Sequence, residues 1–70
     1  MRVEINGADV ELGEGANVRD AALAVGVEPG GRGIAIALDG EVVPRTRLEE
    51  TTLSEGQRVE VVRAIGGGGR

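Results

Sequence analysis

Cysteine, histidine, lysine and every aromatic residue are absent from this chain of 70 residues. Without cysteine it has no disulfide, no thiolate metal ligand and no thiol redox chemistry. Without histidine, lysine and tyrosine, no side chain titrates near neutral pH by default, and no imidazole or side-chain amine can act as base, nucleophile or ligand. Twelve acidic residues remain, but so small a core offers no deep pocket to tune a carboxylate pair. We therefore expect no catalytic residue, no metal site, no bound cofactor and no enzymatic activity.

Other absences restrict the partners and the location. No apolar run approaches the roughly 20 residues needed to cross a bilayer, and the start of the chain does not resemble a signal peptide. We therefore expect a cytoplasmic protein without a membrane partner. The net charge is −4, and no aromatic side chain is available to stack on bases, so a nucleic-acid partner is disfavoured as well.

Two hairpins and a final strand are predicted from alternation and turn residues. Asn6-Gly7 separates two short alternating segments, and Asp39-Gly40 separates GIAIAL from EVV; both dipeptides tolerate the positive φ angles of a two-residue hairpin turn. RVEVVRAI is the last and longest predicted strand, with Val59 and Val61 facing inward. Val62 breaks this alternation, so it either faces a partner or is turned inward by a strand bulge.

One short helix is predicted between the hairpins. Asn17 is a suitable N-cap and Asp20, three residues later, can bond the free amides of the first turn. Gly26 suits a left-handed C-cap, which limits the helix to two or three turns. The face that would pack on a sheet carries small and branched residues: Val18, Ala21, Ala22 and Val25.

The segment between the second hairpin and the final strand has no clean period. We expect a helical turn at residues 47–50, with Leu48 and Leu53 anchored in the core. Two hairpins that flank a helix bury their apolar faces together only if the sheet wraps around the helix, with the last strand beside the first. The sequence therefore predicts an α+β, ubiquitin-like β-grasp domain at residues 1–65, with a mixed sheet of four to five strands and one short helix.

Residues 66–70, GGGGR, form the predicted flexible tail. Extended, five residues reach at most about 17 Å, which is enough to enter a narrow channel in another protein. Glycines suit that task because no side chain obstructs the walls. The alternative is a terminus or linker without function, for which glycine runs are common, and composition alone favours it.

Three blocks of the sequence, taken with the tail, resemble one family. These are a short opening strand into NG, the block GIAIALDGEVVPR, and the block LSEGQRVEVVRAIGG at the matching distance. Together they resemble the ubiquitin-like sulfur carriers, most closely the ThiS-type carriers of thiamine biosynthesis. The resemblance covers nearly the whole chain. The related molybdopterin carriers are usually longer and richer in aromatic residues.

The resemblance implies a protein co-substrate on which other enzymes act. In such carriers a ThiF-like adenylating enzyme, related to ubiquitin-activating enzymes, uses ATP and magnesium to adenylate the C-terminal glycine carboxylate. A sulfur donor such as a cysteine desulfurase then converts the acyl adenylate to a thiocarboxylate, which supplies sulfur to a ThiG-like thiazole synthase. Activation is needed because a carboxylate oxygen is a poor leaving group, and a thioacid sulfur can be carried without any cysteine.

The end of the chain departs from the family pattern. The family's terminal glycine pair falls on Gly67 and Gly68, which leaves Gly69 and Arg70 as an overhang. A channel shaped for glycine would reject the arginine side chain, so Arg70 is removed alone, or with Gly69, or the partner is permissive. Three milder departures bear on the partner more than on the fold: Leu48 where an aromatic is frequent, Asp39 where Asn is frequent, and Gln57 where an acid is frequent.

The expected partner-binding residues lie near the projected end of the sheet and at the start of the tail: Val62, Arg63, Ile65, Gly66 and Arg45. The arginines can pair with acids of a partner, although solvent-exposed arginines are ordinary. A carrier for molybdopterin or cysteine synthesis remains a rival within the same class. From another class comes a ubiquitin-like protein-binding module with an inert tail, whose activity would survive removal of residues 67–70.

Overall fold

The computed structural model describes residues 1–64 of the chain. The predicted domain boundary and the tail, residues 65–70, lie outside the described residues. Within residues 1–64 the chain forms five strands, one α-helix and one 3-10 turn: β1 (Arg2–Ile5), β2 (Ala8–Glu11), α1 (Val18–Ala24), β3 (Ile34–Leu38), β4 (Glu41–Val42), η1 (Arg45–Arg47) and β5 (Arg58–Arg63). No helix in this part of the chain is long and apolar enough to cross a membrane.

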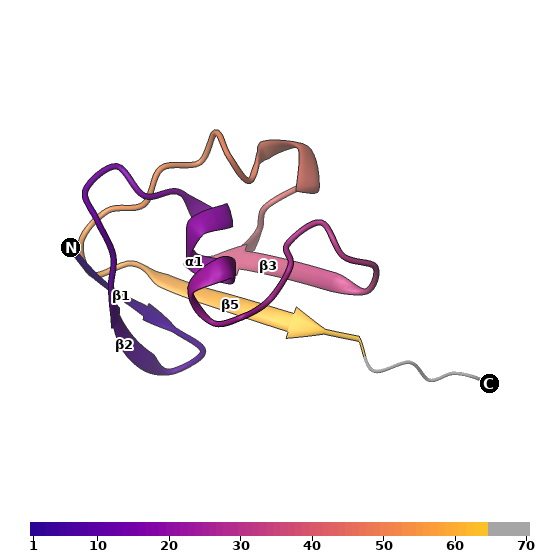
Figure 1. The fold of residues 1–70 in the computed structure, drawn as a ribbon, viewed down its shortest axis with the longest axis horizontal. Helices are drawn as coiled ribbons and strands as arrows, with labels where there is room; N and C mark the ends of the chain where they lie inside the picture. The colour runs from indigo at the N-terminus through magenta and orange to yellow at the C-terminus, as the bar shows by residue number, and fades with distance from the viewer. Residues whose placement is uncertain (65–70) are drawn as a thin grey trace.

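The five strands form one mixed sheet in the order β2-β1-β5-β3-β4. The last strand, β5, lies in the middle, parallel to β1 and antiparallel to β3. Helix α1 packs across β3 and β5 on one face of the sheet (Figure 1). This arrangement confirms the predicted β-grasp fold, including the position of the final strand beside the first.

Both predicted hairpin turns are present. Asn6 and Gly7 have φ angles of 51° and 86°, and Asp39 and Gly40 have φ angles of 49° and 88°. Two consecutive positive φ angles match the right-handed twist of the strands that the turn joins. The second hairpin is short because Pro44, whose nitrogen carries no hydrogen, follows β4 closely.

Helix α1 begins with the predicted capping residues. The Asp20 amide donates to Asn17 Oδ1 at 2.8 Å, and the Asn17 amide donates to Asp20 Oδ2 at 2.9 Å. This reciprocal capping box satisfies two amides at the helix start. Gly26, with φ of 78°, follows the C-cap as predicted. Val25 is the exception, because the helix ends at Ala24 and the valine side chain is exposed instead of packed on the sheet.

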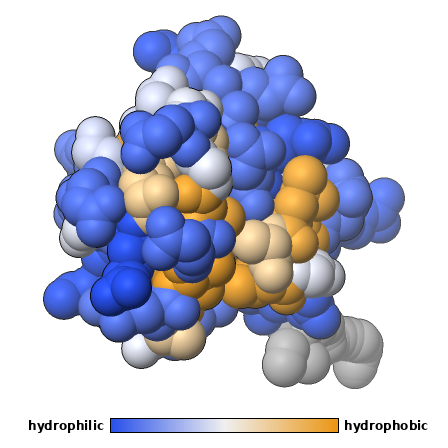
Figure 2. Space-filling model, turned by 60° about the vertical axis from the view of Figure 1, so that its left-hand side comes forward, coloured by the Kyte–Doolittle hydropathy of each residue, from blue (hydrophilic) through white to orange (hydrophobic). Residues whose placement is uncertain are grey.

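The core lies between α1 and the inner face of the sheet. Leu48 and Leu53 are buried as predicted, and they anchor the crossing between β4 and β5 to the rest of the core: Val3, Ile5, Val18, Ala21, Ala22, Ile36 and Val59. The helical turn in this crossing starts two residues earlier than predicted, at Arg45, because Pro44 with φ of −60° precedes it. The surface seen in Figure 2 is mostly hydrophilic, with hydrophobic side chains gathered near its middle.

Candidate functional site

The sheet has one face without a covering helix, which we call the open face. Val59 and Ile36 point toward α1 in the core, so their strand neighbours point the opposite way. Val62 pairs with Ala35 in regular register, which excludes the bulge that the sequence left open. The valine is 58% exposed, so Val62 lies on the open face, where a partner could contact it.

Four small or branched apolar residues adjoin on this face, because directly paired strand positions share a face. Ala35 is paired with Val62, and Ala37 is paired with Val42. Val42 is 72% exposed, which is more than any other large apolar residue of the described chain. We call these four residues, Ala35, Ala37, Val42 and Val62, the apolar patch.

The other half of the open face is charged. Arg58 at the start of β5 lies 3.3 Å from Glu4 Oε2 on β1, and Arg2 lies 3.9 Å from Glu11 Oε1 on β2. These pairs are largely exposed and contribute little to stability. They nevertheless distinguish two halves of one face: ion pairs over β1 and β2, and the apolar patch over β3, β4 and the end of β5.

The end of β5 extends beyond its neighbour β1. Pairing with β1 is recorded for Arg58 and Val59, and the Asn6 side chain then accepts a hydrogen bond from the Val61 amide at 2.8 Å. Pairing with β3 continues to Arg63, opposite Ile34. The end of β5 is therefore supported by β3 alone, beside the apolar patch.

The structure brings the described partner-binding candidates to one end of the sheet. Val62 and Arg63 are consecutive on β5, and Arg45 lines a surface hollow together with Ile34 and Ala35, the residues opposite them. Neither arginine makes an ion pair with another residue of the range 1–64. The remaining predicted site residues lie outside the described residues: Ile65, Gly66, Gly67, Gly68, Gly69 and Arg70.

Two departures from the family pattern contact each other. Gln57 Nε2 donates to Asp39 Oδ2 at 3.0 Å, and the Arg58 amide donates to Asp39 Oδ1 at 3.0 Å. The Arg58 amide first, and the Gln57 side chain second, hold the pKa of Asp39 below its ordinary value. With asparagine at position 39 and glutamate at position 57, residue 39 would donate the hydrogen bond and residue 57 would accept it. The two departures therefore compensate.

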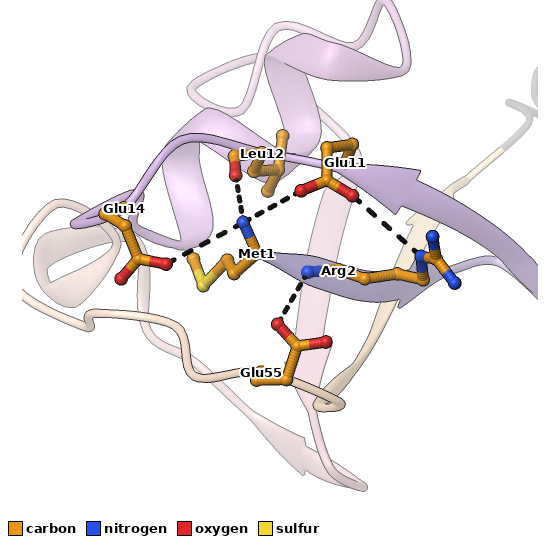
Figure 3. A network of polar contacts seen from close by, with 6 residues as sticks. All are labelled: Met1, Arg2, Glu11, Leu12, Glu14 and Glu55. Atoms are coloured by element: carbon orange, nitrogen blue, oxygen red, sulfur yellow. Dashed lines mark hydrogen bonds and ion pairs between the residues drawn. The ribbon is translucent and has the colours of Figure 1, made fainter.

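A polar network at the N-terminus was not predicted from the sequence (Figure 3). The Met1 ammonium group donates to Leu12 O at 2.6 Å and to Glu11 Oε2 at 3.1 Å, and it lies 3.8 Å from Glu14 Oε2. The hydrogen bond to Glu11 is the main cause that raises the pKa of this amine. Acidic residues in and shortly after the second strand of the first hairpin were the only sequence signal.

The chemistry that these residues offer is recognition. No group of three or more acidic residues within residues 1–64 is arranged to hold a metal ion. The exposed patch and the two arginines can instead contact another protein.

Comparisons with known proteins bear on the fold and the family of this chain. The family model described as the ThiS family matches residues 2–68. A crystal structure of a thiamine biosynthesis protein (ThiS) from Geobacter metallireducens has a TM-score of 0.77 and 30% identity, covering 97% of this chain and 100% of that one. A solution structure of a thiamine biosynthesis protein from the same organism has a TM-score of 0.74 and 30% identity, covering 100% and 91%. Comparison with curated proteins gives no match.

Proposed function

Because the chain belongs to the ThiS family, we propose that it carries sulfur for thiazole formation in thiamine biosynthesis. The observation that carries this proposal is the end of β5: a central strand runs to Arg63 at the rim of the sheet, and a run of four glycines follows in the sequence after Ala64 and Ile65. The similar structures are named for thiamine biosynthesis, which favours this pathway over the molybdopterin and cysteine rivals.

The chain's own contribution is a terminal carboxylate that another enzyme can reach. In the proposed reaction a carboxylate oxygen of the terminal glycine attacks the α-phosphorus of ATP, with magnesium on the phosphates, and pyrophosphate leaves. The outer sulfur of a persulfide on a donor such as a cysteine desulfurase then attacks the carbonyl carbon and displaces AMP, which gives an acyl disulfide. A second thiol, such as that of free cysteine, cleaves the sulfur–sulfur bond, releases the thiocarboxylate and is itself oxidised to a disulfide with the donor. The partner enzyme supplies the catalytic groups, in line with the absence of histidine, cysteine and lysine from this chain.

The acting terminus is proposed to be Gly68, after removal of Gly69 and Arg70. The family match ends at residue 68, which supports the assignment of Gly67 and Gly68 to the family's terminal pair. Loss of Arg70 alone would make Gly69 the acting residue. Either product ends in glycine, which has no Cβ to collide with a narrow channel.

The apolar patch and the neighbouring arginines are proposed to dock the partners. The adenylating enzyme and the thiazole synthase must both place the same terminus in an active site. A shared docking surface around the end of β5 would serve both, with Val62 on the open face. Alternation places Arg63 on the opposite face, so Arg63 and Arg45 would contact the partner from the rim of the sheet. The rival binding-module function uses this same surface and differs only in the role of the tail.

Intact mass tests the proposed reaction. The chain would be incubated with the cognate adenylating enzyme, ATP, magnesium, a cysteine desulfurase and cysteine. Because none of these components cleaves a peptide bond, we expect the chain isolated from its native cells to lack Arg70 already, with or without Gly69. Incubation should then replace one oxygen by sulfur at the new terminus. A matched variant that is produced already ending at Gly68 should be converted without trimming.

Two outcomes contradict the proposal. If neither the full chain nor the variant ending at Gly68 gains sulfur, the carrier function is wrong. If removal of residues 67–70 leaves all partner-dependent activity intact, the tail is inert and the binding-module function is correct.

A further inference from the structure

The last recorded contact of β5 is a hydrogen bond to Gly33. The Ala64 amide donates to the Gly33 carbonyl oxygen at 2.7 Å, one position beyond the Ile34–Arg63 pair that ends the ladder. Because β1 supports β5 only near its start, this bond is the final link between the end of β5 and the rest of the described fold.

Gly33 is suited to this position by its backbone and by its lack of a side chain. Its φ is +77°, in the left-handed region that costs other residues energy. A Cβ placed there would lie 3.4 Å from both the Cβ and the carbonyl oxygen of Ala64, its two nearest neighbours. Any larger side chain at this position would press against Ala64.

The position of Gly33 places its carbonyl oxygen at the end of β5. Gly33 directly precedes β3, and its carbonyl oxygen accepts the hydrogen bond from the Ala64 amide. Within residues 1–64 this is the last backbone hydrogen bond of β5, and six residues of sequence follow Ala64.

We propose that Gly33 is a positioning residue, which fixes the point and the direction from which the C-terminal segment is presented to a partner's active site. This inference rests on the proposed carrier function. Docking through the apolar patch fixes the position of the sheet on the partner, and the Gly33–Ala64 bond then fixes where the tail begins. Loss of that bond would move the last backbone link of β5 within residues 1–64 back from Ala64 to the Ile34–Arg63 pair, and would lower the fraction of docked carriers whose terminus is correctly placed.

Two kinds of variant break the anchor by different routes. Gly33→Ala strains the left-handed φ and leaves Ala64 in ordinary contact with the new Cβ, whereas Gly33→Val adds the same strain and two further methyl groups beside Ala64. Ala64→Pro removes the N–H donor and leaves Gly33 unchanged. Gly15→Ala and Gly15→Val are the matched controls, because Gly15 has a φ of +85° and no atom within 4 Å of an added Cβ.

The first measurement needs no partner enzyme. Amide exchange by NMR should show the Ala64 amide opening about tenfold more easily in Gly33→Ala than in the native chain. The Gly15 variants should destabilise the fold to a similar degree and leave Ala64 exchange unchanged relative to global unfolding. Equal Ala64 exchange in the native chain and in Gly33→Val would overturn the proposed anchor.

The second measurement is the steady-state rate of thiocarboxylate formation with the adenylating enzyme. We expect kcat to fall about tenfold in Gly33→Val and Ala64→Pro, whereas the KM for the carrier, which reports docking, stays as in the native chain. Unchanged kcat in these variants overturns the positioning role and leaves the carrier function standing. A raised KM with unchanged kcat also overturns it, because the anchor would then serve docking. These variants are made in the form that ends at Gly68, and failure of that form with native Gly33 and Ala64 to gain sulfur overturns the carrier function itself.

Discussion

The two ends of the protein's central strands are held in opposite ways. At one end the Met1 amine is bound by Leu12 and Glu11 and approached by Glu14. At the other end, within residues 1–64, one hydrogen bond from Ala64 to Gly33 is the last contact of β5. The parallel pairing of β1 and β5 places these ends at opposite sides of the sheet (Figure 1). Within residues 1–64, several contacts thus hold the side of the sheet at the start of β1, which we call the firm end. Fewer contacts hold the side at the end of β5, which we call the presented end.

The firm end joins three segments that are distant in sequence. The Arg2 amide donates to Glu55 Oε1 at 2.9 Å, and the Gly56 amide donates to the Arg2 carbonyl at 2.8 Å. These contacts connect β1 to the turn before β5, while the Met1 contacts connect β1 to the segment after β2. A small chain without disulfides gains order there from many weak contacts that act together.

The largest effect on stability should come from the core between α1 and the sheet. Ile5 is 1% exposed, and Ile5→Ala should lower the free energy of unfolding by about 2–5 kcal/mol, because burial is lost and a cavity remains. Urea denaturation followed by circular dichroism would measure it. Val42→Ala, at a side chain that is 72% exposed, is the control and should change stability by less than about 0.5 kcal/mol. Equal losses would contradict the described core.

The protein should lose folding stability at alkaline pH because of its N-terminal amine. Folding raises the pKa of the Met1 amine above its ordinary value of 8.0, so its contribution to stability is complete below that pH. The contribution is lost as pH rises through the raised pKa. No lysine, cysteine, tyrosine or histidine is present to titrate in this range, so the urea midpoint should report this one group.

Nα-acetylation tests that assignment. The acetylated chain should be less stable at pH 7 and should show no further loss between pH 8 and about pH 11, because the titrating amine is gone. Glu11→Gln, which keeps the amine and removes its main partner, should give an intermediate result. A native chain whose midpoint is constant over this range would contradict the network.

Asp39 should produce a smaller effect at acid pH. Because the pKa of Asp39 is lowered by its bonds to the Arg58 amide and Gln57, its contribution is present above its ordinary value of 3.8 and is lost as pH falls through the lowered pKa. Asp39→Asn should remove that acid dependence and lower the urea midpoint slightly at pH 7. The reversed pair Asp39→Asn with Gln57→Glu should recover most of the loss, and a strictly additive double variant would contradict compensation.

The sequence predicted the fold better than the site. Turn and cap residues such as Asn6, Asn17 and Gly26 act through local backbone preferences, which a sequence displays directly. The Val62 orientation stayed open, because alternation alone does not show whether a strand contains a bulge. The Gly33–Ala64 bond and the Met1 network join residues that are distant in sequence, and no local pattern marks such contacts.

The smallest effect on stability should come from the presented end. Val62→Ser should change the free energy of unfolding by less than about 0.5 kcal/mol, because the native side chain is already 58% exposed. Its affinity for the adenylating enzyme should nevertheless fall about tenfold, since burying a valine in an interface contributes roughly 1.5 kcal/mol or more. Leu23→Ser is a matched control, because Leu23 is 41% exposed on the helix, away from the open face. Calorimetric titration of the adenylating enzyme with both variants would measure these affinities. If Val62→Ser and Leu23→Ser bind with equal affinity, Val62 does not contact the partner. The proposed docking would then have to use a surface other than the open face.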